Sequence, residues 1–233
     1  EKNISLKNLK KVFIIYEGQP YQKNVISYLK KKNNSIKVTG YDHSAPPALP
    51  LNLFFDRCSP DKLLITGKEQ ALFYKKYLNW PKSRLKIIPS FRFKNQKKIF
   101  FQNRIFLPFE LNDKDIFLES FRILTNLNMI KNITNFQVKI HPLGLKIKEH
   151  IKFAESINKI IKNNQFSKKN VNNNSSIFFG QTTAIIVALE LNFRCYHVCS
   201  YPIFDSYSPK LWNSLKVQQL SNNLFVYELR RKN

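Results

Sequence analysis

The chain of 233 residues contains only five glycines, and their placement limits the folds that it can adopt. Each glycine follows a short apolar, β-rich run, either directly or within a few residues. The five are Gly18, Gly40, Gly67, Gly144 and Gly180. Glycine tolerates the backbone of a tight turn better than other residues, so this placement predicts strands that end in turns and lead into helices. In open α/β sheets, such turns are where ligands bind.

Amphipathic segments alternate with these apolar runs. The expected helices cover residues 20–32, 68–78, 112–127, 147–161 and 182–191. In residues 147–161, isoleucines recur on one side and lysines cover the other, as in a helix that packs on a core. The alternation predicts an α/β fold with parallel sheets in two Rossmann-like domains. A polar, lysine-rich stretch at residues 89–103 predicts a hinge, which gives domains of residues 1–92 and 93–233.

The composition indicates where in the cell the protein is expected and in which redox state its cysteines are. The sequence has no uninterrupted apolar run of about 18 residues and no signal-peptide pattern, so we expect a cytoplasmic protein. Three cysteines, Cys58, Cys195 and Cys199, indicate reduced thiols, and Cys195 lies with His197 in a run that predicts a buried strand.

The formal net charge of +24 at pH 7 attracts polyanions. Phosphorylated substrates and an anionic inner membrane surface are candidates, so a peripheral position on that membrane stays open. The even spread of lysines among asparagines is explained equally well by codon composition. Because basic and aromatic residues do not alternate on any expected strand, we expect no nucleic acid as partner.

The first candidate site is a histidine-proline turn. His141 and Pro142 follow the apolar run at residues 136–140, so His141 is expected at the carboxyl end of a strand that Pro142 terminates. A histidine in this place can donate a hydrogen bond to a phosphate oxygen and stabilise a departing nucleotide. The alternative is a loop histidine that makes a local hydrogen bond.

The second candidate site is a glycine turn with two hydroxyl groups. Gly180, Gln181, Thr182 and Thr183 follow an apolar run and open an expected helix. The N–H groups at the start of a helix, together with the threonine hydroxyls, can bind a phosphate. A threonine that only caps the helix is the alternative.

In combination, these turns resemble the nucleotide half of GT-B glycosyltransferases, especially bacterial transferases of the sialic-acid, Kdo and polysaccharide-assembly kind. Residues 16–21 and 40–44 resemble the acceptor half of the same group, in which an acidic-glycine turn and a second turn follow successive strands. Residues 60–67 and 88–92 are similar to the last strands before the GT-B hinge. The resemblance implies two Rossmann-like domains that face a cleft, with an incomplete first domain.

The resemblance also implies roles in the acceptor half. Glu17, next to Gly18, would be the general base that takes a proton from the acceptor hydroxyl, whereas the alternative is an acid that caps the next helix. His43 would be a second acid or base, or would only order the loop that follows. The family pattern has a second acid where this chain has Tyr16.

In the nucleotide half, the resemblance implies that His141 and Thr183 hold the donor phosphates with assistance from Thr182. Many GT-B enzymes bind the nucleotide ribose with a glutamate in the following helix, where this chain has Val187. This departure leaves the donor undefined.

We therefore expect a transferase that moves a sugar from a CMP- or UDP-linked donor to a surface polysaccharide or a lipid-linked glycan. No metal or cofactor is expected beyond the donor itself, since Asp113 and Asp115 are typical of a helix start rather than of a metal motif. The alternatives are a polyol-phosphate transferase or a nucleotide-sugar epimerase of the same fold, a basic module that binds polyanions without catalysis, and an inactive partner in an assembly complex.

Overall fold

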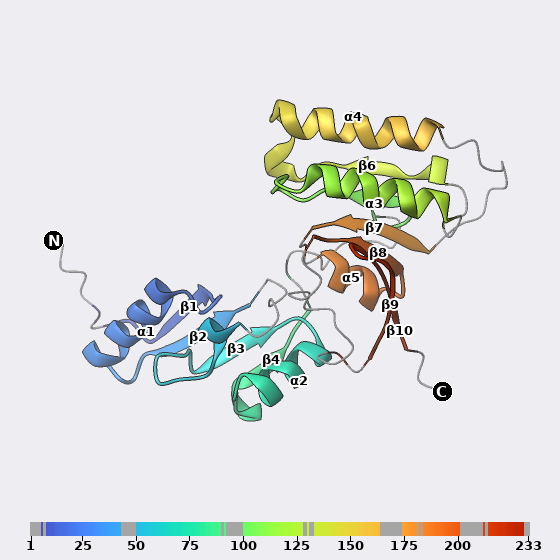
Figure 1. Ribbon diagram of the computed structural model, residues 1–233. Helices are drawn as coiled ribbons and strands as arrows, with labels where there is room; N and C mark the ends of the chain where they lie inside the picture. The colour runs from blue at the N-terminus through green and yellow to red at the C-terminus, as the bar shows by residue number, and fades with distance from the viewer. Residues whose placement is uncertain are drawn as a thin grey trace. The chain divides into compact units, whose positions relative to one another are not determined.

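The computed structural model divides into two compact units, Glu1–Lys94 and Asn95–Asn233, and each unit has its own sheet with helices packed on it (Figure 1). The residues that the structure describes are 6, 8–42, 50–89, 91, 100–127, 130, 133–163, 174–180, 182, 184–200, 212 and 214–230. The expected domain boundary at residue 92 lies outside them. Across these ranges, no helix combines the length and the apolar character that a membrane span requires.

The first unit contains a four-stranded parallel sheet in which the spatial order of the strands follows the chain, β1-β2-β3-β4. Its elements are β1 (Lys11–Ile15), α1 (Pro20–Lys32), β2 (Lys37–Tyr41), β3 (Lys62–Ile65), α2 (Lys68–Tyr77) and β4 (Leu85–Ile87), with short 3-10 turns at Leu51–Leu53 and Lys82–Arg84. Since all four strands are parallel, their carboxyl ends share one edge of the sheet.

The sequence predicts a turn at Gly40, but in the structure this residue lies inside β2. A Cβ atom at this position would come within 2.9 Å of both the Pro60 side chain and the Cβ atom of Tyr16. The glycine is therefore required for close packing, and not for a left-handed backbone.

Asp61 connects β2 to α1 through its carboxylate. The carboxylate accepts hydrogen bonds from the Val38 backbone N–H at 2.8 Å and from Lys30 Nζ at 3.2 Å. Burial alone would raise the pKa of Asp61, but these two hydrogen bonds outweigh burial, so the pKa is lowered.

We expect Asp61→Asn to lower the free energy of unfolding by about 1 kcal/mol at pH 7, because the amide replaces a charge-assisted acceptor that is partly screened by solvent. A lowered pKa in the folded state contributes stability above the unfolded pKa of about 3.9, and this contribution is lost as the pH falls through the folded value. The difference between variant and wild type should therefore shrink from pH 7 to pH 3 in urea denaturation. An equal difference at both pH values would contradict this role of the carboxylate.

The second unit contains a six-stranded sheet with the order β6-β5-β7-β8-β10-β9. Its elements are β5 (Arg104–Phe106), α3 (Lys114–Asn126), β6 (Gln137–Lys139), α4 (Lys148–Asn163), β7 (Ser175–Phe179), α5 (Ala184–Glu190), β8 (Arg194–Val198), β9 (Leu215–Ser221) and β10 (Leu224–Leu229), with short 3-10 turns at Ile133–Asn135 and Pro142–Gly144. The strands β5 to β8 pair in parallel, as expected from the alternation of helix and strand.

The hairpin of β9 and β10 departs from the expected parallel arrangement, since both of its pairings are antiparallel. Only Asn222 and Asn223 separate the two strands. A two-residue connection can join antiparallel neighbours, whereas a parallel crossover needs about a dozen residues. The fold is therefore mixed α/β, with parallel strands as its main part.

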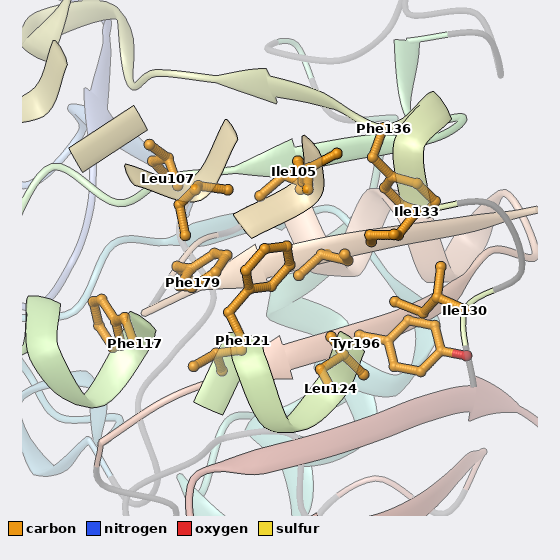
Figure 2. Close-up of a cluster of buried hydrophobic side chains, with 14 of the residues drawn as sticks. Ile105, Leu107, Phe117, Phe121, Leu124, Ile130, Ile133, Phe136, Phe179 and Tyr196 are labelled. Atoms are coloured by element: carbon orange, nitrogen blue, oxygen red, sulfur yellow. The ribbon is translucent and has the colours of Figure 1, made fainter. Parts of the chain in front are cut away.

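The core of the second unit lies between the sheet and the pair α3 and α4, which pack on one of its faces (Figure 2). Phe179 of β7 is fully buried in this core. Its ring centroid lies 5.6 Å from that of Phe117, 5.7 Å from Phe121 and 6.1 Å from Phe153. On the opposite side of β7 and β8, α5 packs against β8 and β10 (Figure 1). The aromatic cluster thus fixes β7, whose carboxyl end forms the Gly180 turn.

Candidate functional site

The candidate site of the second unit lies at the carboxyl edge of its sheet, where the strand order reverses. β5 pairs in parallel with β6 on one side and with β7 on the other. His141 follows β6, Gly180 follows β7, and Pro108 and Phe109 follow β5 between them. Neighbouring strands lie about 4.8 Å apart, so roughly 10 Å separates the ends of β6 and β7. Open α/β sheets bind their ligands at such a reversal of strand order.

His141 lies half-buried at this edge, as the histidine-proline turn predicts. Its ring centroid is 5.6 Å from that of Phe109, and Pro142 begins a 3-10 turn. The Nδ1 atom of His141 accepts a hydrogen bond from the Leu143 backbone N–H at 3.3 Å. In a neutral ring, the hydrogen is then on Nε2, which is the donor that a phosphate oxygen needs. The local hydrogen bond is present, and it orients the ring.

Gly180 adopts the left-handed backbone that its place after β7 predicts, with φ of +60°. Its N–H donates to the Val198 carbonyl at 2.8 Å, and a Cβ atom would come within 3.1 Å of the Pro108 Cβ atom. This close approach joins the Gly180 turn to the end of β5, next to Phe109. A side chain at this position would therefore strain the backbone and press on Pro108.

Thr182 is half-buried, and its Oγ1 accepts a hydrogen bond from the Ala184 N–H at 3.3 Å. The contact matches the capping interpretation of this residue. The helix α5 that follows has seven residues, so the turn has little helix dipole to offer an anion. Gln181 and Thr183 lie outside the described residues.

His197 holds the Gly180 turn in place, a contact that the sequence does not reveal. The side chain is 1% exposed, and its Nε2 atom lies 2.8 Å from the Gly180 carbonyl oxygen. A carbonyl oxygen can only accept, so Nε2 carries the hydrogen. The other nitrogen, Nδ1, then accepts from the Tyr227 hydroxyl at 3.1 Å. The sequence correctly predicts that His197 lies in a buried strand, but its only further signal is that a buried histidine needs partners.

Replacement of His197 by leucine should lower the free energy of unfolding by about 1–3 kcal/mol, since the Gly180 carbonyl and the Tyr227 hydroxyl both lose a buried partner. Tyr227→Phe is the matched control, because it keeps the bond to Gly180 and should cost only about 1 kcal/mol. Urea denaturation measures both. A larger loss for Tyr227→Phe would show that the bond to Gly180 is not the important one.

In the first unit, the turn after β1 is held by side chains on both sides. Gly18 has φ of +72°, and a Cβ atom there would come within 2.2 Å of the Asn52 carbonyl oxygen. Asn52 Nδ2 donates to the Glu17 carbonyl at 2.6 Å, and the Glu17 N–H donates to Gln22 Oε1 at 2.9 Å. Gln22 also accepts from the Gln19 N–H at 3.0 Å, so its side chain satisfies two backbone N–H groups at the start of α1. The backbone of Glu17 is therefore fixed while its side chain is half-buried at the carboxyl edge.

Tyr16, which stands where the resembled family has an acid, belongs to the core of the first unit. It is fully buried, and its ring packs edge-on against Trp80 at 6.3 Å. Burial raises the pKa of Tyr16 to about 12. The residue therefore fills space beneath the turn and stays protonated at neutral pH.

Asp42 is a buried acid at the carboxyl edge of the first sheet. The sequence does not single it out, although it lies in the motif at residues 40–44. It is 1% exposed, and its Oδ2 atom accepts from Gln70 Nε2 at 2.9 Å and from the Tyr74 hydroxyl. Burial and the nearby Asp42 charge raise the pKa of Tyr74 well above its usual value, so the hydroxyl remains a donor. The network ties the end of β2 to α2. His43, the next residue, lies outside the described residues.

Two further observations bear on the chemistry of the site. In the part of the chain that the structure describes, no three His, Cys, Asp or Glu side chains come together in a way that could hold a metal ion. Comparisons with protein-family models, curated proteins and solved structures find no match to this chain.

Proposed function

We propose that this chain is a glycosyltransferase that moves a sugar from a CMP- or UDP-linked donor to a surface polysaccharide or a lipid-linked glycan, without a metal. The observation that carries the proposal is the carboxyl edge of the second sheet, where the His141 and Gly180 turns flank Phe109 at the reversal of strand order. A nucleotide-sugar donor brings a phosphate group and a flat base. The edge offers hydrogen-bond donors for the phosphate. It also offers the ring of Phe109, which is 46% exposed, for the base.

In the proposed reaction, the Glu17 carboxylate takes the proton of the acceptor hydroxyl as that oxygen forms a bond to the anomeric carbon of the sugar. The bond between this carbon and the donor phosphate oxygen breaks, and its electron pair leaves with the nucleotide. Donation from His141 Nε2 and from the hydroxyls of Thr182 and Thr183 stabilises the charge that develops on the phosphate. His43 is the candidate for a second acid or base.

Under this proposal, the two units act as the acceptor and nucleotide halves of a GT-B enzyme that works at the cytoplasmic side of the cell envelope. The support comes from each unit by itself. Each has parallel strands whose carboxyl edge has polar side chains, and in each a left-handed glycine shapes the turn. A fixed Glu17 backbone is what a general base needs, since proton transfer depends on position.

Incubation of the protein with CMP- and UDP-sugars and an extract of lipid-linked glycans, followed by product analysis, tests the proposal. A transferase releases the nucleotide and extends the glycan. An epimerase leaves the nucleotide sugar joined but changes its sugar, and a polyol-phosphate transferase moves the phosphate together with the polyol. An unchanged donor with every acceptor would contradict the proposal and favour a basic module without catalytic activity.

A further inference from the structure

Four large aliphatic side chains are exposed around the turn that follows His141. Their exposed fractions are 70% for Leu143, 58% for Leu145, 39% for Ile147 and 40% for Ile151. The fold does not use them, because α4 buries a different set of residues, namely His150, Phe153, Ala154, Ile157 and Ile161. Ile147 and Ile151 are four residues apart and so lie on one side of the helix start. Apolar side chains that gather on a surface in this way mark an interaction site.

Backbone hydrogen bonds and packing hold the turn that presents the leucines. The Gly144 N–H donates to the His141 carbonyl at 2.7 Å, and the Ile147 N–H donates to the Gly144 carbonyl at 3.0 Å. Gly144 also packs directly on the buried His150 ring, since a Cβ atom would come within 2.4 Å of Nδ1. Little conformational freedom remains to be lost when the leucines bind a partner.

Lysines lie between and beside the exposed aliphatic residues in the sequence. Lys146, Lys148 and Lys152 are all exposed. Two acidic residues lie in this region: Glu149, whose carboxylate bonds to Lys114 Nζ at 2.9 Å, and Glu155, which is exposed one helical turn after Ile151. We name this exposed set of apolar and basic side chains the docking surface, and its three lysines the basic rim. Its residues are Leu143, Leu145, Lys146, Ile147, Lys148, Ile151 and Lys152.

We propose that the docking surface binds an anionic lipid bilayer, with its leucines and isoleucines among the upper acyl chains and its lysines at the headgroups. The charge decides between possible partners. A second copy would bring two basic rims together in a chain with a net charge of +24, which repels association. Nucleic acid would bind the lysines but offer nothing to the four aliphatic side chains. An anionic bilayer satisfies both parts of the surface.

This inference goes beyond the transferase proposal and does not depend on it, because binding to a bilayer requires no catalysis. The docking surface begins two residues after His141. The histidine-proline turn is thereby held beside the lipid headgroups.

Sedimentation with phosphatidylcholine vesicles that do or do not contain phosphatidylglycerol tests the proposal. We expect the wild-type chain to bind the anionic vesicles more tightly than the neutral ones. The double variant Leu143→Ser/Leu145→Ser should bind the anionic vesicles about tenfold more weakly, since two exposed apolar side chains no longer enter the bilayer. Neutralisation of the three rim lysines to glutamine should reduce binding by about tenfold or more.

Matched controls change the same residue types elsewhere on the surface. Leu51 and Leu72 are 80% and 54% exposed in the first unit, and their double replacement by serine should leave vesicle binding unchanged. Replacement of the exposed lysines Lys10, Lys31 and Lys75 by glutamine should reduce binding less than replacement of the rim lysines. Equal binding by wild type and Leu143→Ser/Leu145→Ser would overturn the proposal. Absence of any preference for anionic vesicles, or a dimer that this double variant dissociates, would also overturn it.

A second measurement locates the contact directly and requires no loss of function. Tryptophan in the variant Leu145→Trp should be quenched by anionic vesicles with brominated acyl chains. The native Trp80 and Trp212 are only 2% and 5% exposed and provide the unquenched background. If Leu145→Trp fluorescence does not change while the protein is bound, the chain binds through another surface and the proposal is wrong.

Discussion

The variant Glu17→Gln is expected to lose sugar transfer by a factor of about 10²–10⁴, because the amide cannot accept the proton of the acceptor hydroxyl. Glutamine has nearly the same shape as glutamate. Two hydrogen bonds that hold this turn, from Asn52 and to Gln22, use the backbone of Glu17, so they remain in the variant. The loss should therefore occur in a folded protein, which circular dichroism of the variant checks. Nucleotide release from a CMP- or UDP-linked donor in the presence of acceptor measures the effect.

Glu119, which is exposed on α3, provides the control for this prediction. Its replacement by glutamine makes the same chemical change away from the candidate site and should leave the rate unchanged. If Glu17→Gln retains the wild-type rate, the general base is another residue, and His43 becomes the first candidate.

The second large effect is expected in the core. Phe179→Ala should lower the free energy of unfolding of the second unit by about 3–5 kcal/mol, because it leaves a cavity among Phe117, Phe121 and Phe153. In a chain with two units, unfolding need not be two-state. Hydrogen exchange of peptides from residues 95–233 therefore measures the effect unit by unit.

Phe13 provides a matched control, since its ring is 56% exposed on β1 of the first unit. Phe13→Ala should change stability by no more than about 0.5 kcal/mol. Similar effects of the two variants would show that Phe179 is not a central core residue.

Local sequence patterns were sufficient to predict the helices. Residues 20–32 form α1 as expected, with Pro20 at its first position, and the other four helices begin and end within two residues of their expected bounds. Helical periodicity and caps are properties of neighbouring residues, so they can be recognised without the tertiary structure. The positions of His141 and Gly180 after strands were predicted for the same reason.

Long-range contacts could not be predicted in this way. The sequence around Phe109 does not indicate that β5 lies between β6 and β7. Nor does it indicate that the Phe109 ring lies beside His141. The side-chain partners of Asp42 and His197 likewise come from segments roughly 30 residues away in the sequence. The strand β4 has only three residues, too few for a period to emerge. The β9 and β10 hairpin did have a signal in Asn222 and Asn223, which favour a tight turn.

Calorimetric titration of the chain with CMP and UDP tests whether the carboxyl edge of the second sheet binds the phosphate of a nucleotide. One of the two nucleotides should bind the wild type. Affinity should fall about 10–100-fold in His141→Ala, which removes a hydrogen bond to a charged group, and should persist in the control Leu143→Ala. Failure of both nucleotides to bind, or equal affinity in His141→Ala and the wild type, would contradict phosphate binding at this edge.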